Sequence, residues 1–133
     1  MIKKIHHVAI AVNNLEDALR FYRDTLGLSV HKIAIQEDQG VKAALVIIGD
    51  AEIELLEPLS PDTPVGKFLE RRGEGLHHVT FQTDNVDKEL TDLKAKGVEF
   101  IDQQPRQGLA GRICFIHPRS TKGVLVELAQ PPE

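Results

Sequence analysis

The stretch that decides the fold is Ile5 to Val12, which reads Ile-His-His-Val-Ala-Ile-Ala-Val. About half a chain later, Leu76 to Phe81 reads Leu-His-His-Val-Thr-Phe and repeats the pattern. Successive side chains of a strand point to opposite faces, so each stretch carries one histidine on either face. His7 shares its face with small residues, whereas the other face is apolar and suits packing against helices. Two such strands indicate a duplicated module that builds one site between its copies.

The order of the expected elements repeats as well. Each half reads strand–helix–strand–strand–strand, with asparagine or aspartate before each helix as a candidate N-cap: Asn13 or Asn14, and Asp84 or Asn85. In the first half we expect a helix at 15–26 and strands at 3–12, 28–35, 41–48 and 51–57. In the second half we expect a helix at 86–93 and strands at 76–83, 98–101, 112–117 and 124–129. The expected organisation is one domain, 1–133, with module 1 at about 1–60, a linker helix within about 61–74 and module 2 at about 75–133.

The composition limits the classes of protein. A chain of 133 residues with 41% hydrophobic and 27% charged residues is typical of one soluble globular domain. The net charge of −4 and the lack of a basic block argue against nucleic acid and against an anionic membrane surface as partners. No apolar run approaches the ~20 residues of a membrane span, and no signal peptide is recognisable. The single cysteine, Cys114, excludes an internal disulfide, so we expect a cytoplasmic protein in which Cys114 belongs to the core or to the lining of the site.

Four residues stand at matching positions of the two modules. They are His7 and His78 near the start, and Glu54 and Glu127 in the last strand. A carboxylate inside a strand as apolar as Gly-Val-Leu-Val-Glu-Leu needs a partner, because burying it alone costs several kcal/mol. Two imidazoles and two carboxylates suit Co²⁺, Ni²⁺, Zn²⁺, Mn²⁺ or Fe²⁺ rather than Ca²⁺. Such an ion would keep open positions for two substrate oxygens and act as a Lewis acid.

The other histidines and the neighbouring glutamates fit no site of this kind. His6 and His77 lie on the opposite strand faces, where packing or solvent is the commoner fate of a histidine. His31 and His117 have no counterpart in the repeat, so we interpret His31 as a surface residue and His117 as the end of a strand. We expect Glu52 and Glu57 to be solvated.

At these residues the sequence resembles the vicinal oxygen chelate superfamily of glyoxalases, extradiol dioxygenases and fosfomycin-resistance enzymes. More narrowly, it resembles the methylmalonyl-CoA epimerase family. The matching stretches cover nearly the whole chain in the family's order: IHHVAIAV, QGVKAALVIIGDAEIELLEPL, GEGLHHVTFQTDN and FIHPRSTKGVLVELAQ. The first is shared across the superfamily, whereas IELLEPL and FIHP-x-S-x-x-GVL-x-EL are more specific to the epimerases.

This resemblance implies an α+β fold in which two tandem βαβββ modules form one open, eight-stranded, barrel-like sheet around a metal site. It implies that His7, Glu54, His78 and Glu127 are the metal ligands, with Co²⁺ as the first choice of ion and Ni²⁺, Zn²⁺ or Mn²⁺ as alternatives. Some family members carry glutamine at the position of Glu54. The implied partners are an acyl-CoA substrate and a second copy of the chain, in a homodimer.

The implied reaction interconverts (R)- and (S)-methylmalonyl-CoA through C2 proton abstraction and a metal-stabilised enolate. Epimerisation needs a base on one face of the substrate and an acid on the other. One proposed base of the family is a glutamate after the QGV stretch, where this chain has Ala43. Glu127 is therefore the first candidate base. Weaker candidates for the second group are Lys42, Glu37 and Gln39, although projection to solvent or to the CoA phosphates is the favoured interpretation of Lys42.

Two further features stay open at the level of sequence. Four cations stand in or near the loops of the second module, and the pattern does not select which of them bind CoA: Arg106, Arg112, Arg119 and Lys122. The main alternative function is a glyoxalase-type isomerase of a glutathione hemithioacetal, and the second is a metal-free binding module. A dioxygenase is disfavoured because it uses two histidines and one carboxylate, and Glu54 would be a second one.

Overall fold

The computed structural model describes residues 1–132 and divides into two compact units. The first unit is His7–His77, and the second unit consists of Met1–His6 together with the chain from His78 onward. Strand β1, Ile2–Ala11, contributes its first residues to the second unit and its remainder to the first. Among residues 1–132, no helix is long and apolar enough to cross a membrane.

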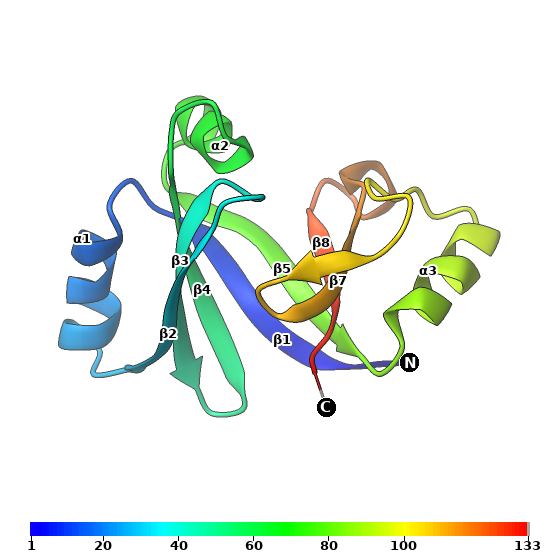
Figure 1. Ribbon diagram of the computed structural model, residues 1–133, viewed down its shortest axis with the longest axis horizontal. Coiled ribbons are helices and arrows are strands. Elements are labelled where there is room, and N and C mark those ends of the chain that lie inside the picture. The colour runs from blue at the N-terminus through cyan, green and yellow to red at the C-terminus, as the bar shows by residue number, and fades with distance from the viewer. Residues whose placement is uncertain (133) are drawn as a thin grey trace. The chain divides into compact units, whose positions relative to one another are not determined.

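In the first unit, the strand order is β2-β3-β4-β1. The strands after β1 are β2 at Ser29–Gln36, β3 at Val41–Ile48 and β4 at Ala51–Pro58. Strand β1 pairs with β4 in parallel, and the other neighbours are antiparallel. Helix α1, Leu15–Leu19, continues as the π-helical segment η1, Arg20–Thr25, and lies along one face of these strands (Figure 1). Its buried leucines pack with apolar side chains of β3 and β4 in the core of the unit.

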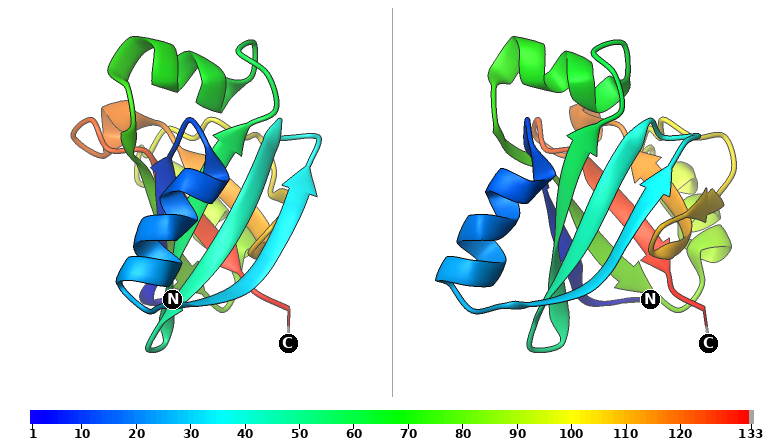
Figure 2. Two further views of the ribbon diagram at one scale, coloured as in Figure 1. Left: turned by 90° about the vertical axis from the view of Figure 1, so that its left-hand side faces the viewer. Right: turned by 60° about the vertical axis from the view of Figure 1, so that its left-hand side comes forward.

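Helix α2, Pro64–Arg72, also belongs to the first unit and lies beyond the end of β4 (Figure 2). Thr63 caps it by accepting a hydrogen bond from the backbone N–H of Gly66, at 3.1 Å from oxygen to nitrogen. It ends at Gly73, whose φ of 75° lies in the region that glycine adopts without steric cost.

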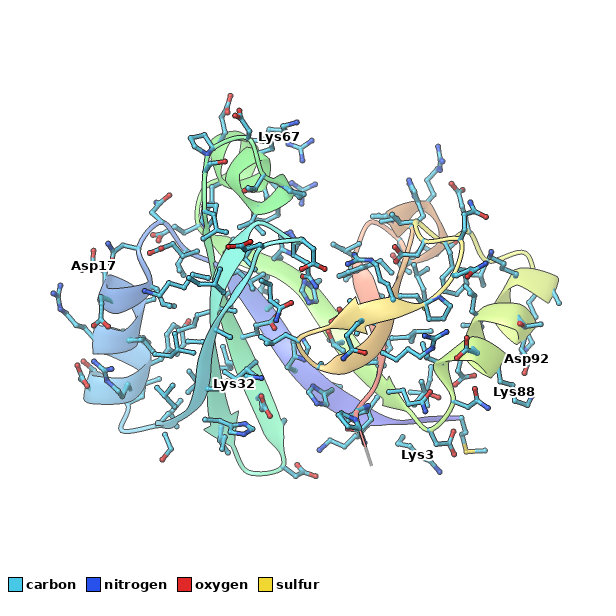
Figure 3. All side chains as sticks on the ribbon, in the orientation of Figure 1. Lys3, Asp17, Lys32, Lys67, Lys88 and Asp92 are labelled. Atoms are coloured by element: carbon cyan, nitrogen blue, oxygen red, sulfur yellow. The ribbon has the colours of Figure 1, made fainter. Side chains whose placement is uncertain are left out.

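The second unit repeats this plan in the order β5-β8-β7-β6. Its elements are β5 at Gly75–Thr83, α3 at Val86–Ala95, β6 at Arg106–Gly108, β7 at Gly111–Ile116, the 3₁₀ turn η2 at Pro118–Ser120, and β8 at Val126–Gln130. The first three residues of β5 belong to the first unit. Strand β5 pairs with β8 in parallel, as β1 does with β4. Helix α3 covers β7 and β8, and the polar side chains Lys88 and Asp92 lie on its outer side (Figure 3).

The repeat extends to the helix caps. Asn14 accepts from the Asp17 N–H at 2.9 Å, and Asn85 accepts from the Lys88 N–H at 3.1 Å. The structure thus selects the second of the two candidate caps in each module. A side-chain cap of this kind stabilises a helix by about 1 kcal/mol.

Three expectations about the elements are wrong. The first helix is not regular through Leu26, because the π-helical segment adds a residue to the turn and shifts the later side chains. Leu26 consequently lies 51% exposed instead of packing in the core. The predicted strand at 98–101 is reduced to one bridge between Phe100 and Ile116, and β6, at Arg106–Gly108, pairs with β7 instead.

Candidate functional site

The first unit contains a buried pair, His7 and Glu54. The register of β1 against β4 sets Ala9 beside Glu54 and His7 beside Glu52, so all four side chains begin on one face. The His7 Nε2 atom lies 3.4 Å from Glu54 Oε1. The two side chains are 1% and 8% exposed. A carboxylate this deep in a protein requires a cationic or strongly polar environment, which fits a metal-ligating role.

The second unit contains the corresponding pair, His78 and Glu127. His78 Nε2 lies 3.4 Å from Glu127 Oε1, and the side chains are 4% and 7% exposed. The register of β5 against β8 sets Thr80 beside Glu127. The Thr80 hydroxyl donates a 2.6 Å hydrogen bond to the same Glu127 oxygen. A short hydrogen bond between buried groups, one of them a carboxylate, fixes the orientation of that carboxylate.

A brace of three residues lies beside the second pair. The ring of Phe115 meets the imidazole of His78 edge to face, with centroids 5.4 Å apart. Asp102 accepts hydrogen bonds from the Phe115 backbone N–H at 2.7 Å and from Arg106 Nε at 3.1 Å. The Arg106 guanidinium in turn lies 5.7 Å from the Phe115 ring centroid. The only sequence signal for this brace is the Asp–x₃–Arg spacing of residues 102–106.

Glu52 and Glu57 are half-buried, whereas we expected them to be solvated. Glu52 Oε2 is buried without a hydrogen-bond partner among the described residues, and its other oxygen lies 3.6 Å from His31 Nδ1. Glu57 accepts a 2.8 Å hydrogen bond from the Leu15 N–H at the start of α1. Both carboxylates therefore belong to the packed structure of the first unit.

The candidate proton-transfer groups of β3 lie on different faces. Ala43 is buried opposite Leu56, so it shares the face of Glu54 and provides no acidic group there. Lys42 starts on the other face, which also carries the core residue Ala44. Glu37 is exposed and Gln39 half-buried in the turn between β2 and β3, where the Gln39 N–H bonds the carbonyl of Gln36.

Of the other three cations that were candidates for binding CoA, two form ion pairs with carboxylates. Arg112 makes two 2.8 Å hydrogen bonds to Asp87 of α3, which lowers the pKa of that carboxyl group. Arg119 is paired in the same way with Glu99, whose pKa it also lowers. Lys122 sits in the turn before β8 at a φ of 65°.

His77, His117 and Cys114 take part in packing or helix capping, as expected for residues outside the site. His77 is half-buried and meets the ring of Phe68 in α2, with centroids 4.9 Å apart. His117 caps η2 by accepting from the Arg119 N–H. Cys114 is fully buried, and burial raises the pKa of its thiol to about 12.

The donor set of the two units fits a divalent ion. His7, Glu54 and His78 are buried and each offers one ligand atom, and Glu127 is buried as well. Imidazole nitrogen and carboxylate oxygen together suit ions of borderline character. Each unit therefore contributes a buried histidine–glutamate pair whose donor atoms suit such an ion.

Comparisons with known proteins agree with this chemistry. Residues 6–115 match the profile of the Glyoxalase/Bleomycin resistance protein/Dioxygenase superfamily. The mitochondrial methylmalonyl-CoA epimerase of Mus musculus is 39% identical over 129 residues, which are 96% of this chain and 72% of that protein. The ethylmalonyl-CoA/methylmalonyl-CoA epimerase of Cereibacter sphaeroides is 36% identical over 133 residues, 98% of this chain and 99% of that protein.

A solved structure extends the comparison to the fold. A methylmalonyl-CoA epimerase in complex with methylmalonyl-CoA and NH4+ matches with a TM-score of 0.95 at 39% identity, covering 98% of this chain and 96% of the other. This match and the observed element order confirm the predicted α+β class with two βαβββ modules. The chain belongs to the Glyoxalase/Bleomycin resistance protein/Dioxygenase superfamily and, within it, to the methylmalonyl-CoA epimerase family.

Proposed function

We propose that the protein is an isomerase that interconverts (R)- and (S)-methylmalonyl-CoA by removing the C2 proton and returning a proton to the opposite face. The observation that carries this proposal is the duplicated, buried histidine–glutamate pair, His7–Glu54 and His78–Glu127. Membership of the epimerase family supports the choice of substrate. The C2 proton lies between a thioester and a carboxylate, so it is acidified on both sides.

We propose His7, Glu54, His78 and Glu127 as the ligands of one divalent ion, with Co²⁺ as the first choice and Ni²⁺, Zn²⁺ or Mn²⁺ as alternatives. A bound ion would supply Lewis acidity to the oxygens of the acyl group. The protein supplies a water-poor environment, because all four side chains are nearly fully buried. In such an environment, charge–charge interactions are much stronger than in water.

We propose Glu127 as one proton-transfer group. The Thr80 hydroxyl fixes its Oε1 atom, which leaves the orientation of the carboxylate defined before substrate arrives. Lys42 is a poor candidate for the second group because it leaves β3 on the face opposite to Ala43. Glu37 and Gln39, in the adjoining turn, stay as candidates for that group.

The broader biological setting is also a proposal. We infer that the modules at about 1–60 and 75–133, with the linker at about 61–74, act as one domain that works as a homodimer in the cytoplasm. The matching reaction belongs to propionate metabolism. Size-exclusion chromatography with light scattering on the purified protein would give the mass of a dimer, and the mass of a monomer would contradict that part.

The decisive experiment is deuterium exchange at C2 of methylmalonyl-CoA in D₂O, followed by mass spectrometry. The protein is loaded in turn with Co²⁺, Ni²⁺, Zn²⁺ and Mn²⁺, and metal content is measured on each sample. Exchange that depends on protein and metal supports the proposal. No exchange with any loaded metal contradicts it.

Two controls in the same assay separate the alternatives. Turnover of the glutathione hemithioacetal of methylglyoxal, without C2 exchange of methylmalonyl-CoA, would indicate a glyoxalase-type isomerase; the relatives do not favour this alternative. Absence of metal binding, with no effect of His7→Ala, would indicate a binding module.

A further inference from the structure

We propose that Arg106 binds the free carboxylate of the acyl group and thereby makes the site selective for carboxylated acyl-CoA esters. This inference rests on the proposed function, which places the acyl group at His78 and Glu127. It assigns a specificity-determining role to a residue that the sequence pattern did not distinguish from its basic neighbours.

The Arg106 guanidinium is fixed before any ligand binds. Its Nε atom donates to Asp102, whose side chain is only 14% exposed, and its plane is supported by the ring of Phe115. Asp102 is fixed in turn by the Phe115 backbone N–H. A cation over an aromatic ring is attracted to it, so this position is favoured over free rotation of the side chain. Less conformational entropy is then lost when an anion binds.

The terminal amino groups of Arg106 are available for an anion. Within residues 1–132, neither of them has a hydrogen bond or an ion pair, and the side chain is 42% exposed. Arg112 and Arg119 differ because each donates Nε and a terminal nitrogen to one carboxylate. The two amino groups of Arg106 form the fork that recognises a planar carboxylate or a phosphate in two hydrogen bonds.

The strand register places Arg106 on the same face as Glu127. Arg106 of β6 pairs with Ile113 of β7, and two residues further along β7 Phe115 pairs with Glu127 of β8. Paired residues of neighbouring strands, and alternate residues of one strand, share a face. Arg112 pairs with Gln107 on the other face and reaches α3 instead.

The acyl carboxylate fits this position better than a CoA phosphate. Arg106 and His78 contact the same Phe115 ring, so the guanidinium stands one side chain away from a proposed ligand of the metal. The CoA phosphates lie at the far end of the pantetheine arm from the reacting carbon. The carboxylate is attached directly to that carbon.

The test measures binding of malonyl-CoA and propionyl-CoA to the Co²⁺-loaded protein by isothermal titration calorimetry. These two ligands share CoA and differ in the carboxylate. In the wild type we expect tighter binding of malonyl-CoA, and Arg106→Gln should lower that preference about tenfold to a hundredfold, the range for a lost charge-assisted contact. Arg106→Lys keeps the charge and should lose less. Arg112→Gln, from the opposite face of the same hairpin, should keep the wild-type preference.

Three results would overturn the assignment. An unchanged preference in Arg106→Gln, with a wild-type thermal midpoint, would show that Arg106 does not contact the carboxylate. Equal weakening of both ligands would point to the CoA phosphates. An equal loss in Arg112→Gln would show a general effect of charge. A wild type that prefers malonyl-CoA through Arg106, yet catalyses no C2 exchange, would refute the proposed reaction and leave the role of Arg106 intact.

Discussion

The two units use the same pair of residues in different surroundings. In both, a histidine Nε2 lies 3.4 Å from a glutamate Oε1 across matching strands. Beside the glutamate, however, the first unit has Ala9, and the second unit has Thr80, which donates to it. The residue opposite differs too, since Leu45 faces Glu54.

In the second unit Phe115 takes that opposite position and adds an aromatic contact to the histidine. Both modules therefore share the strand pairing, and they differ in the residues that occupy the positions beside and opposite the glutamate. The Thr80 hydroxyl orients the Glu127 carboxylate, which supports our proposal that Glu127 transfers a proton in addition to binding the ion, whereas we propose Glu54 as a ligand alone.

The largest effect is expected from the histidines. His7→Ala and His78→Ala should each abolish the bound ion if both pairs serve one metal. Metal analysis should therefore give one ion per wild-type chain and none in either variant, and each variant should lose the thermal stabilisation that a bound ligand provides, about 4 kcal/mol at a thousandfold excess over Kd. Two ions per chain, with one kept in each variant, would show two separate sites.

Substitution of each glutamate should distinguish the roles of the two pairs. Glu127→Gln should slow C2 exchange about a thousandfold, because general acid–base catalysis contributes in that range. Glu54→Gln keeps an oxygen ligand and should cost less than about tenfold. Metal content is measured on both variants, so that loss of the ion is not mistaken for loss of a base. Equal losses at equal metal content would show that the pairs are equivalent.

Thr80→Val should have a smaller effect. The valine has nearly the shape of threonine but removes the hydroxyl that donates to Glu127, and loss of a hydrogen bond to a buried carboxylate costs about 1–3 kcal/mol. We expect a severalfold lower kcat, with KM little changed because the Thr80 side chain is fully buried and donates to Glu127. Ala9→Ser, at the matching position of the first unit, should leave kcat within about twofold. A similar fall in both variants would indicate a general packing effect.

The two buried pairs and the strands that carry them were largely predictable from the sequence, because they depend on the alternation of side chains along a strand. The repeated His-His stretches and the matched glutamates identified all four buried residues of the two pairs, since a period of two leaves no freedom in choosing the face. Strands β3 and β4 were predicted within one residue of their observed ends for the same reason. The N-caps were reduced to two candidates each, and the structure distinguishes between neighbours that sequence propensity treats alike.

The features that could not be predicted depend on contacts between residues that are distant in the chain or lie in irregular segments. Asp102 and Arg106 stand in a loop with no periodic pattern, so their contacts with Phe115 could not be read from the sequence. The burial of Glu52 depends on His31, which a bulge in β2 displaces from regular alternation. The π-helical segment after α1 has no composition signal, yet it moves Leu26 out of the core.

The smallest expected effect concerns Cys114 and its counterpart Ala44, which occupy the same register position opposite Leu128 and Leu55. Burial raises the pKa of the Cys114 thiol to about 12, whereas the unfolded chain has an ordinary thiol. The unfolded state therefore loses its proton first as the pH rises through about 9, and the native state keeps its proton until about 12.

Stability should consequently be fully present below pH 9 and fall as the pH rises towards 12, by about 1 kcal/mol at pH 10. Urea unfolding at pH 8 and pH 10 measures the change in the free energy of unfolding. The variant Cys114→Ala, which has in β7 the side chain that β3 has at the matching position, should lack the contribution of the thiol to that change. Lysines and the tyrosine titrate in the same range in both proteins, so only the difference between them reports on the thiol. If the free energy of unfolding falls equally with pH in both proteins, the buried thiol does not resist ionisation. Cys114 and Ala44 would then differ only in the volume that they fill in the two cores.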